Sequence, residues 1–284
     1  MINKPNILVL GQNGFIGKKI FIFLKKKKYN LISYTKRSEI LNSVQKANII
    51  INCAGNNKNN FLSSNVLFLK EILKLVKNKK ILLIQLSSLS VYGATEVNSS
   101  DIKFINENFH KFPNSDYGKS KLSAEKEIKK TSKKKNFNYI ILRIGSIDCK
   151  NTKNNFLINL RKIIKFNFFI FLDNKYAILN LLSINRLNYI INLIINNKTL
   201  FYNEVFNVCD NITLYDFLLK NSKYKKFFNI NISNKFIINT LIKVLSKTMK
   251  INKKKFNNLF LKNIYMNKKI NNIINKINQR EISK

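Results

Sequence analysis

Acidic side chains are scarce in this sequence: 14 Asp and Glu stand against 52 Lys and Arg, which gives a formal net charge of +38. Such an excess makes nucleic acid a partner to consider. Arginine, however, which makes most base and phosphate contacts, occurs only five times. Lysine, asparagine and isoleucine are abundant along the whole chain, as codon bias would produce. We therefore expect salt-sensitive, nonspecific binding and no specific nucleic-acid partner.

Cysteine is also scarce, and Cys53, Cys149 and Cys209 are far apart. Their spacing fits neither a disulfide framework nor a C-x-x-C zinc pattern. The single histidine, His110, has no Cys, Asp or His cluster near it, so we expect no metal site. Free thiols in odd number favour a reducing, cytoplasmic location.

Long apolar runs are missing, and the N-terminal residues lead into a strand-like segment without a cleavable signal pattern. The longest apolar stretches, such as residues 81–86 and 168–172, are too short to span a bilayer. Hydrophobic residues nevertheless make up 45% of 284 positions, enough for a large core. The composition predicts a folded protein without a membrane span.

Glycine is rare but concentrated, with seven residues in total and none beyond Gly145. Three of them form Gly11-Gln12-Asn13-Gly14-Phe15-Ile16-Gly17, between a predicted strand and a predicted helix. Glycines at this spacing permit a tight turn and a close backbone approach to a pyrophosphate, which the helix N-terminus then attracts. We expect this loop, including Asn13, Phe15 and Ile16, to bind a dinucleotide.

Buried strands and helices alternate through the first half of the chain, as expected for a parallel sheet covered on both faces. The predicted strands are 7–10, 31–35, 49–53, 81–86, 139–144 and 205–209, and the predicted helices are 15–26, 38–46, 66–77, 115–130 and 187–195. The expected fold is α/β, a Rossmann-type doubly wound parallel sheet with a smaller, mostly helical C-terminal substrate lobe.

The texture of the sequence changes near residue 150, where glycine disappears. We expect residues 1–150 to form the dinucleotide-binding domain, with 180–210 returning to it. Residues 151–179 and 211–284 are assigned to the substrate lobe and to a basic helical tail that frays from about Lys268.

The segment after the second strand bears on the choice of dinucleotide. An NAD site places an acid about 20 residues beyond the glycines, where it binds the ribose hydroxyls. Arg37 stands 20 residues after Gly17, and together with Ser38 it suits a 2′-phosphate. NADP is therefore favoured over NAD, with the alternative that Arg37 is a solvated charge and Glu39 binds the ribose.

Tyr117 and Lys121 lie at i and i+4, on one face of a predicted helix. A nearby ammonium favours the phenolate, so we expect a lowered Tyr117 pKa and a role as general acid or base. Tyr265 and Lys269 repeat the spacing in the glycine-free tail. Only Tyr117 follows a strand that ends in hydroxyls, the segment Ser87-Ser88-Leu89-Ser90, and ligands bind beyond such strand ends. The alternative for these serines is a capped loop.

Taken together, these motifs resemble the extended short-chain dehydrogenase/reductase superfamily, in its NAD-dependent epimerase/dehydratase branch acting on nucleotide sugars. The resemblance covers about residues 6–210. Besides the glycine loop and the Tyr117–Lys121 pair, it includes Asn52-Cys53-Ala54-Gly55, Asn65, Ser87 to Gly93, Leu142-Arg143 and Phe206-Asn207-Val208.

The resemblance implies a role for each matching residue. Tyr117 is then the acid/base, Lys121 binds the nicotinamide ribose, and Ser88 orients the substrate oxygen. Ala54, Gly55 and Ser87 join the cofactor site. Ser88, Ser90, Asn155 and Lys175 form the candidate substrate site.

Departures from the family pattern limit the substrate assignment. Leu89 and Ser90 stand where dehydratases carry Asp-Glu, which disfavours dehydration. Tyr176 stands where the family usually has an arginine that binds the diphosphate, and Lys175 is the candidate substitute. Only about thirteen residues separate the second strand from Ile49, so the strand that usually cradles the adenine is expected to be absent.

The resulting hypothesis is an NAD(P)-dependent reductase or 4-epimerase of a nucleotide-activated sugar, serving surface polysaccharide synthesis. Arg37 tilts the choice toward reduction. A homodimer is one option for its assembly. The alternative is a protein of the same fold that binds NAD(P) and has lost the chemistry.

Overall fold

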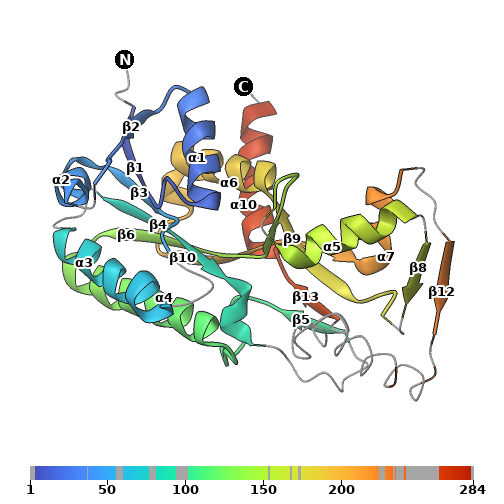
Figure 1. Ribbon diagram of the computed structural model, residues 1–284. Coiled ribbons are helices and arrows are strands. Elements are labelled where there is room, and N and C mark those ends of the chain that lie inside the picture. Colours follow the sequence, from blue (N-terminus) through green and yellow to red (C-terminus); the bar gives the residue numbers. More distant parts are fainter. Residues whose placement is uncertain are drawn as a thin grey trace.

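The protein is described here by a computed structural model covering residues 4–36, 38–55, 60–76, 81–93, 102–152, 154–166, 168–171, 174–223, 228–232, 234, 240 and 262–282. Its centre is a six-stranded, wholly parallel sheet in the order β10-β6-β4-β3-β1-β2 (Figure 1). The strands are β1 (Asn6–Leu10), β2 (Asn30–Ile32), β3 (Ile49–Asn52), β4 (Leu82–Ser88), β6 (Asn138–Ile144) and β10 (Glu204–Val208).

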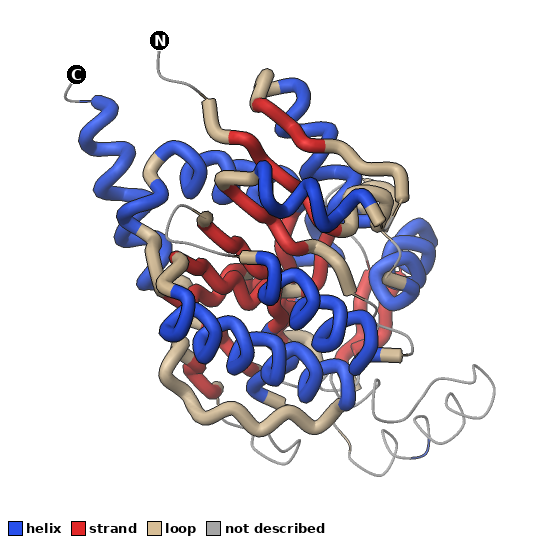
Figure 2. Tube along the Cα trace, turned by 90° about the vertical axis from the view of Figure 1, so that its left-hand side faces the viewer, coloured by secondary structure: helices blue, strands red, loops and turns tan. Residues whose placement is uncertain are grey.

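Helices cover both faces of this sheet, as Figures 1 and 2 show. One face carries α1 (Phe15–Lys26), α6 (Ile184–Asn196) and α10 (Lys268–Ile282), and the other α2 (Glu39–Lys46), α3 (Phe68–Leu75) and α4 (Asp116–Lys135). Alternate residues of each strand serve the two cores: Ile7 and Val9 join the first, Leu8 and Leu10 the second. The predicted Rossmann-type α/β class is confirmed.

Element boundaries differ from the sequence predictions where a local backbone device decides them. The second strand ends at Ile32, three residues before the predicted end. Helix α4 continues to Lys135, five residues beyond the predicted end, and stops where Asn136 adopts a left-handed conformation with φ of 55°. Strand β2 forms the edge of the sheet, so the described chain has no further strand on the adenine side.

Shorter elements extend from the carboxyl edge of the large sheet. Strand β9 (Ile178–Ser183) pairs with β7 (Ser146–Asp148) and β11 (Asp210–Thr213), β8 (Phe168–Phe171) with β12 (Phe228–Asn231), and β5 (Lys103–Ile105) with β13 (Asn263–Tyr265). Helices α5 (Asn155–Ile163) and α7 (Leu214–Asn221) pack on β8 and β9 through buried Leu157, Phe171 and Phe217. The short turns Ile164–Phe166 and Lys198–Leu200 are 3₁₀-helical.

The predicted fraying from Lys268 is wrong. Residues Lys268–Ile282 form the continuous helix α10, whose Ile270 and Ile277 are buried in the same core as α1 and α6. The lysine content of this segment hid an apolar stripe at helical spacing.

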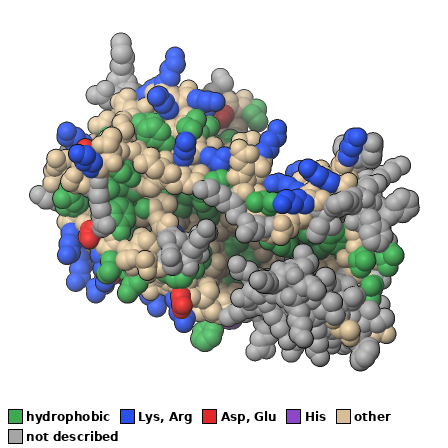
Figure 3. Space-filling view, viewed as in Figure 1, with side chains coloured by type: hydrophobic (Ala, Val, Ile, Leu, Met, Phe, Trp, Pro, Cys, Tyr) green, Lys and Arg blue, Asp and Glu red, His purple; other side chains and the backbone are tan. Residues whose placement is uncertain are grey.

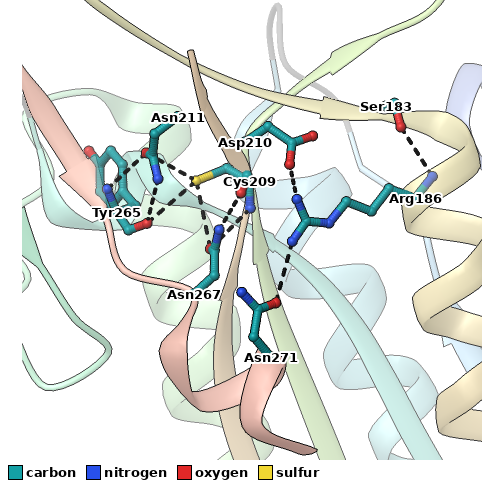
Figure 4. Close-up of polar contacts among 8 residues, drawn as sticks. All are labelled: Ser183, Arg186, Cys209, Asp210, Asn211, Tyr265, Asn267 and Asn271. Carbon is teal, nitrogen blue, oxygen red and sulfur yellow. Dashed lines mark hydrogen bonds and ion pairs between the residues drawn. The ribbon is translucent and has the colours of Figure 1, made fainter. Parts of the chain in front are cut away.

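A polar cluster fixes the start of α10 (Figure 4). Asn267 donates to the carbonyl of Cys209, and Asn211 exchanges two hydrogen bonds with the backbone of Tyr265, at 3.0 and 3.1 Å. Arg186 of α6 pairs with Asp210 and reaches Asn271 of α10. These contacts hold β13 and α10 against the end of β10.

In the part of the chain that the structure describes, no helix is both long and apolar enough to cross a membrane. The same residues contain no cluster of three or more His, Cys, Asp or Glu side chains with metal-binding geometry.

Candidate functional site

The glycine loop follows β1 and opens α1, as its spacing predicted. Gly11 has a φ of +77°, and the Gly14 amide donates to its carbonyl at 2.8 Å. A Cβ on Gly17 would lie 2.1 Å from the Gly11 oxygen, so only glycine lets the helix pack this close to the turn. Asn13 and Gly14 are exposed at the helix N-terminus, where backbone amides suit a pyrophosphate.

The end of β3 lies directly against this loop. A Cβ on Gly11 would come within 2.8 Å of the Ala54 nitrogen, so the two turns touch through their backbones. Buried Asn52 fixes the second turn: its Oδ1 accepts from the Ala54 amide at 3.1 Å, and its Nδ2 donates to Gln85 at 2.8 Å. Ala54 and Gly55 thus present a surface with little side chain beside the glycine loop, which a ligand could approach closely.

The hydroxyl-rich end of β4 supplies two serines with different roles. Ser88 caps the 3₁₀ turn Leu89–Tyr92, accepting from the Ser90 amide at 3.2 Å and donating to the Ser90 hydroxyl at 3.0 Å. Ser87 is buried, and its hydroxyl donates to Glu125 at 2.6 Å. The structure therefore commits the Ser87 side chain to the protein interior and leaves its backbone as the part that could meet a cofactor.

Helix α4 brings Tyr117 and Lys121 to the same edge. A Cβ on Gly118 would lie 2.4 Å from the Ser90 carbonyl, so this glycine allows the helix to approach the serine turn. Ser115 caps the helix by accepting from the Gly118 amide at 3.1 Å. The Ser88 side chain lies close enough to the Tyr117 phenol to lower its pKa through hydrogen bonding, and the Lys121 ammonium lies 5.8 Å from the centre of the tyrosine ring.

Lys121 is held over the ends of two strands. Its Nζ donates to the Leu86 carbonyl of β4 at 3.1 Å and would lie 3.3 Å from a Cβ on Gly55. A π-helical turn, Ser63–Leu67, carries Asn65 to the same point, where its amide donates to Ser120 at 2.9 Å. One continuous candidate site therefore lies at the carboxyl edge of the sheet. It consists of the glycine loop, Ala54, Lys121, Tyr117 and Ser88.

Burial sets the protonation of this site. It raises the pKa of Tyr117, with the Ser88 hydrogen bond opposing, and it lowers the pKa of Lys121 to about 8. The expectation that Lys121 lowers the Tyr117 pKa toward neutrality is wrong, because desolvation of the phenol dominates and the opposing effect comes from Ser88. Burial also raises the pKa of the Cys53 thiol to about 12, so Cys53 stays neutral. The Tyr117 phenol therefore keeps its proton at neutral pH.

A buried ion pair supports the serine turn from below. Arg143 of β6 holds both carboxylate oxygens of Glu125, at 3.0 and 2.7 Å, and also donates to the Tyr92 hydroxyl at 2.7 Å. Tyr92 in turn donates to Asn207 of β10 at 2.6 Å. Glu125 escaped the sequence analysis although it continues the i, i+4, i+8 face of Tyr117 and Lys121.

The ribose end of the site differs from the expectation in part. Arg37 lies outside the described residues. Glu39, the alternative ribose acid, is turned back on its own loop, where it accepts from the amides of Thr35 and Lys36 at 2.7 and 3.4 Å. These bonds lower the Glu39 pKa and direct its carboxylate toward its own loop. Gln12 and Tyr34, which the sequence analysis did not assign, lie beside Gly11 instead.

The family model for the NAD-dependent epimerase/dehydratase family matches residues 7–164, more than half of the chain. The chain belongs to this family. This agrees with the resemblance to the extended short-chain dehydrogenase/reductase superfamily. No protein of curated function matches the sequence.

Solved structures with the same fold include several family enzymes at low identity. UDP-N-acetylglucosamine 4-epimerase from Bacillus cereus has a TM-score of 0.65 at 17% identity, covering 81% of this chain and 85% of that one. UDP-glucuronic acid 4-epimerase from Bacillus cereus, solved with NAD, has 0.60 at 17%, covering 80% and 87%. The protein RMD from Pseudomonas aeruginosa, solved with NADPH, has 0.62 at 17%, covering 80% and 85%.

The candidate substrate residues are not brought together in the way that the candidate cofactor residues are. Ser90 shares a hydrogen bond with Ser88, whereas Asn155 begins α5 and its side chain lies outside the described part. Lys175 sits between two rings, 4.5 Å from the Tyr215 centroid and 5.6 Å from that of Tyr176. None of the contacts among the described residues links Lys175 to Ser88 or Tyr117.

The second tyrosine–lysine pair does not form a site. Tyr265 lies on β13 and is buried against Tyr92, whereas Lys269 lies on α10 and pairs with Glu204. The i, i+4 spacing was therefore informative only where one helix carried both residues.

Proposed function

We propose that this family member is an NAD(P)-dependent enzyme that reduces the 4-keto group of a nucleotide-activated sugar, or epimerises at that carbon, in surface polysaccharide synthesis. The observation that supports this most strongly is the position of Lys121, whose Nζ lies 5.8 Å from the centre of the Tyr117 ring and beside Gly55, while Ser88 acts on the same phenol. In that arrangement a proton donor and a hydroxyl lie together at the carboxyl edge of the sheet, next to the turns proposed to bind the dinucleotide.

The residues at the edge fit a nicotinamide dinucleotide. Gly11, Gly14 and Gly17 leave room at the opening of α1 for a diphosphate, and Asn13, Phe15 and Ile16 complete that turn. Ala54, Gly55 and the backbone of Ser87 line the nicotinamide half, with Lys121 at its ribose. The bound cofactor supplies or accepts a hydride.

NADP is proposed as the preferred form. Among the described residues of the loop between β2 and α2 there is no acid, and Glu39, the first residue of α2, directs its carboxylate to the amides of Thr35 and Lys36. Arg37 is the proposed partner of that phosphate, together with Ser38. Titration with NADPH and NADH by fluorescence tests the assignment, and equal affinities would defeat it.

Protonation favours reduction over epimerisation. Reduction of a ketone requires a proton at the carbonyl oxygen as the hydride arrives at carbon. Because burial raises the Tyr117 pKa, the phenol holds that proton at neutral pH, and Ser88 orients the same oxygen. Lys121 positions the adjoining ribose through an ammonium anchored on Leu86. Dehydration is not proposed, since Leu89 and Ser90 carry no acid or base for water elimination.

The substrate lobe is proposed to comprise residues 151–179 and 211–284, with Asn155 and Lys175 binding the nucleotide diphosphate and Ser90 joining Ser88 at the sugar. The two rings beside Lys175 hold its ammonium in place. We further propose a cytoplasmic enzyme with no specific nucleic-acid partner and no metal, for which a homodimer is one assembly.

A direct assay tests the activity. The protein is incubated with NADPH and a UDP-4-keto-6-deoxy sugar, and the loss of absorbance of the reduced cofactor is followed. The alternative, a protein that binds NAD(P) but has lost the chemistry, predicts binding without turnover. Analysis of any small molecule released on denaturation separates the two catalytic options, because an epimerase retains its cofactor between cycles and a reductase releases it.

A further inference from the structure

Tyr34 makes an unusual contact with the phosphate-binding turn. Its phenol oxygen accepts from the Gly11 amide at 3.0 Å, and its carbonyl accepts from the Gln12 side chain at 2.6 Å. Tyr34 follows β2 and stands 17 residues after Gly17, three residues before Arg37 and close to the separation of about 20 at which dinucleotide-binding folds place their ribose acid. The contact thus joins the loop after β2 to the loop after β1 where an adenosine ribose belongs.

Two hydrogen-bonding capacities remain at this junction. The Tyr34 hydroxyl accepts from Gly11 and keeps its own proton, for which the described residues show no acceptor. The Gln12 Oε1 is buried and has no hydrogen-bond partner in the described part of the chain. Tyr34 and Gln12, which contact each other through the Tyr34 carbonyl, thus offer one donor and one acceptor, the two capacities that a hydroxyl group satisfies because it both donates and accepts.

The acid that this position lacks is not supplied from the neighbouring helix. Glu39 caps its own loop through Thr35 and Lys36, and its carboxylate is exposed to solvent. Tyr34 and Gln12 are neutral, so they bind a ribose hydroxyl without repelling a 2′-phosphate.

We propose that Tyr34 and Gln12 together recognise a ribose hydroxyl of the adenosine half of the dinucleotide, in place of the usual carboxylate. The inference rests on the proposed dinucleotide function and specifies how this chain performs it. The phenol also couples recognition to the phosphate turn, because the same oxygen that meets the ribose accepts from Gly11.

Removal of one oxygen atom tests the proposal. Tyr34→Phe is expected to weaken NADH binding about tenfold, the effect of losing one hydrogen bond of about 1.4 kcal/mol, while the ring keeps its packing. Gln12→Leu is expected to act in the same direction. Tyr189→Phe, which loses a surface hydrogen bond to Asn278, is the matched control and leaves the affinity unchanged.

Deoxy analogues separate direct contact from support of the loop. NADH lacking the 2′- or the 3′-hydroxyl of the adenosine ribose is titrated against wild type and Tyr34→Phe. The loss caused by the substitution should shrink to less than threefold with the analogue that lacks the contacted hydroxyl.

Each outcome decides the matter. Unchanged or tighter binding of NADH by Tyr34→Phe overturns the inference, and so does an equal loss with all three dinucleotides, which would make Tyr34 a support of the loop only. Wild-type protein that binds neither NADH nor NADPH rejects the proposed function and this inference together. Wild-type binding that Tyr34→Phe and Gln12→Leu both retain rejects the inference alone.

Discussion

Tyr117 shows how a single side chain is prepared for proton transfer by opposing effects. Burial disfavours its phenolate, while Ser88 stabilises it through a hydrogen bond. Burial also lowers the pKa of Lys121, so its ammonium loses a proton more easily. This is the residue that the sequence spacing suggested would lower the pKa of the phenol. The protein alone therefore holds a neutral phenol beside a cation that gives up its proton unusually easily.

Replacement of Tyr117 by phenylalanine tests the proton donor. The ring keeps its edge contact with Phe61, 6.1 Å between centroids, so the fold and dinucleotide affinity are expected to persist. Turnover of the keto sugar is expected to fall about 10²–10⁴-fold, the usual contribution of a positioned acid. Tyr265→Phe, from the second tyrosine–lysine pair, serves as control, and full activity in Tyr117→Phe would remove the assigned role.

The buried Lys121 makes stability depend on pH. Its pKa is about 8 in the folded protein against an ordinary value of 10.5, so between these values the unfolded chain binds a proton that the folded chain does not, and stability rises with pH. Wild type is expected to gain up to about 3 kcal/mol over this window relative to Lys121→Met. Urea unfolding of both proteins from pH 7 to 10.5 measures the difference.

The control for this experiment is Lys119→Met, which removes an exposed lysine two residues away. Its stability difference from wild type should be small and nearly constant with pH. A pH-independent difference between wild type and Lys121→Met would show that Lys121 is better solvated than its burial implies.

The positions of candidate residues were predictable where they depend on local spacing. The glycine loop, Tyr117 with Lys121, and Ser88 could be located because each occupies a fixed distance from a strand or helix end. Tyr34, Gln12 and Glu125 could not, because their partners lie on other elements: Gly11 for Tyr34, and Arg143 and Ser87 for Glu125.

Among the elements, the five strands β1, β3, β4, β6 and β10 were readable because each is a nearly continuous apolar run buried on both faces. The three-residue strands β5 and β13 were not, since each is stabilised by the other across most of the sequence. Helix α10 was misread because lysine and asparagine surround its few apolar residues.

The role of α10 can be tested by shortening one side chain. Ile270 is fully buried, so Ile270→Ala is expected to lower the free energy of unfolding by about 2–5 kcal/mol. Ile282, in the same helix, is 86% exposed, and Ile282→Ala should change stability by less than about 0.5 kcal/mol. Equal effects in denaturant unfolding would mean that the helix does not dock.

For the whole molecule, the charge excess is large, with a formal net charge of +38. Figure 3 shows lysine and arginine side chains at several separate places on this face, with few acidic ones between them. A net charge of +38 spread in this way attracts polyanions without reading them.

Binding to random-sequence duplex DNA should therefore be measurable at about 50 mM salt and fall by about 10³–10⁵ at 200 mM, if six to ten phosphates are contacted. Fluorescence anisotropy with labelled duplexes of two unrelated sequences measures both the salt dependence and any preference. Binding that survives at 200 mM and distinguishes the sequences would instead indicate specific recognition.

The docking of α10 also affects how the protein is made. Helices α1 and α6 share a core with residues near the end of the chain, so a ribosome releases them long before the helix that covers them. Until α10 is made, the apolar residues of α1 and α6 that it covers are exposed beside the glycine loop. General chaperones bind such exposed apolar surface. A protein truncated before residue 268 should therefore bind these chaperones or precipitate.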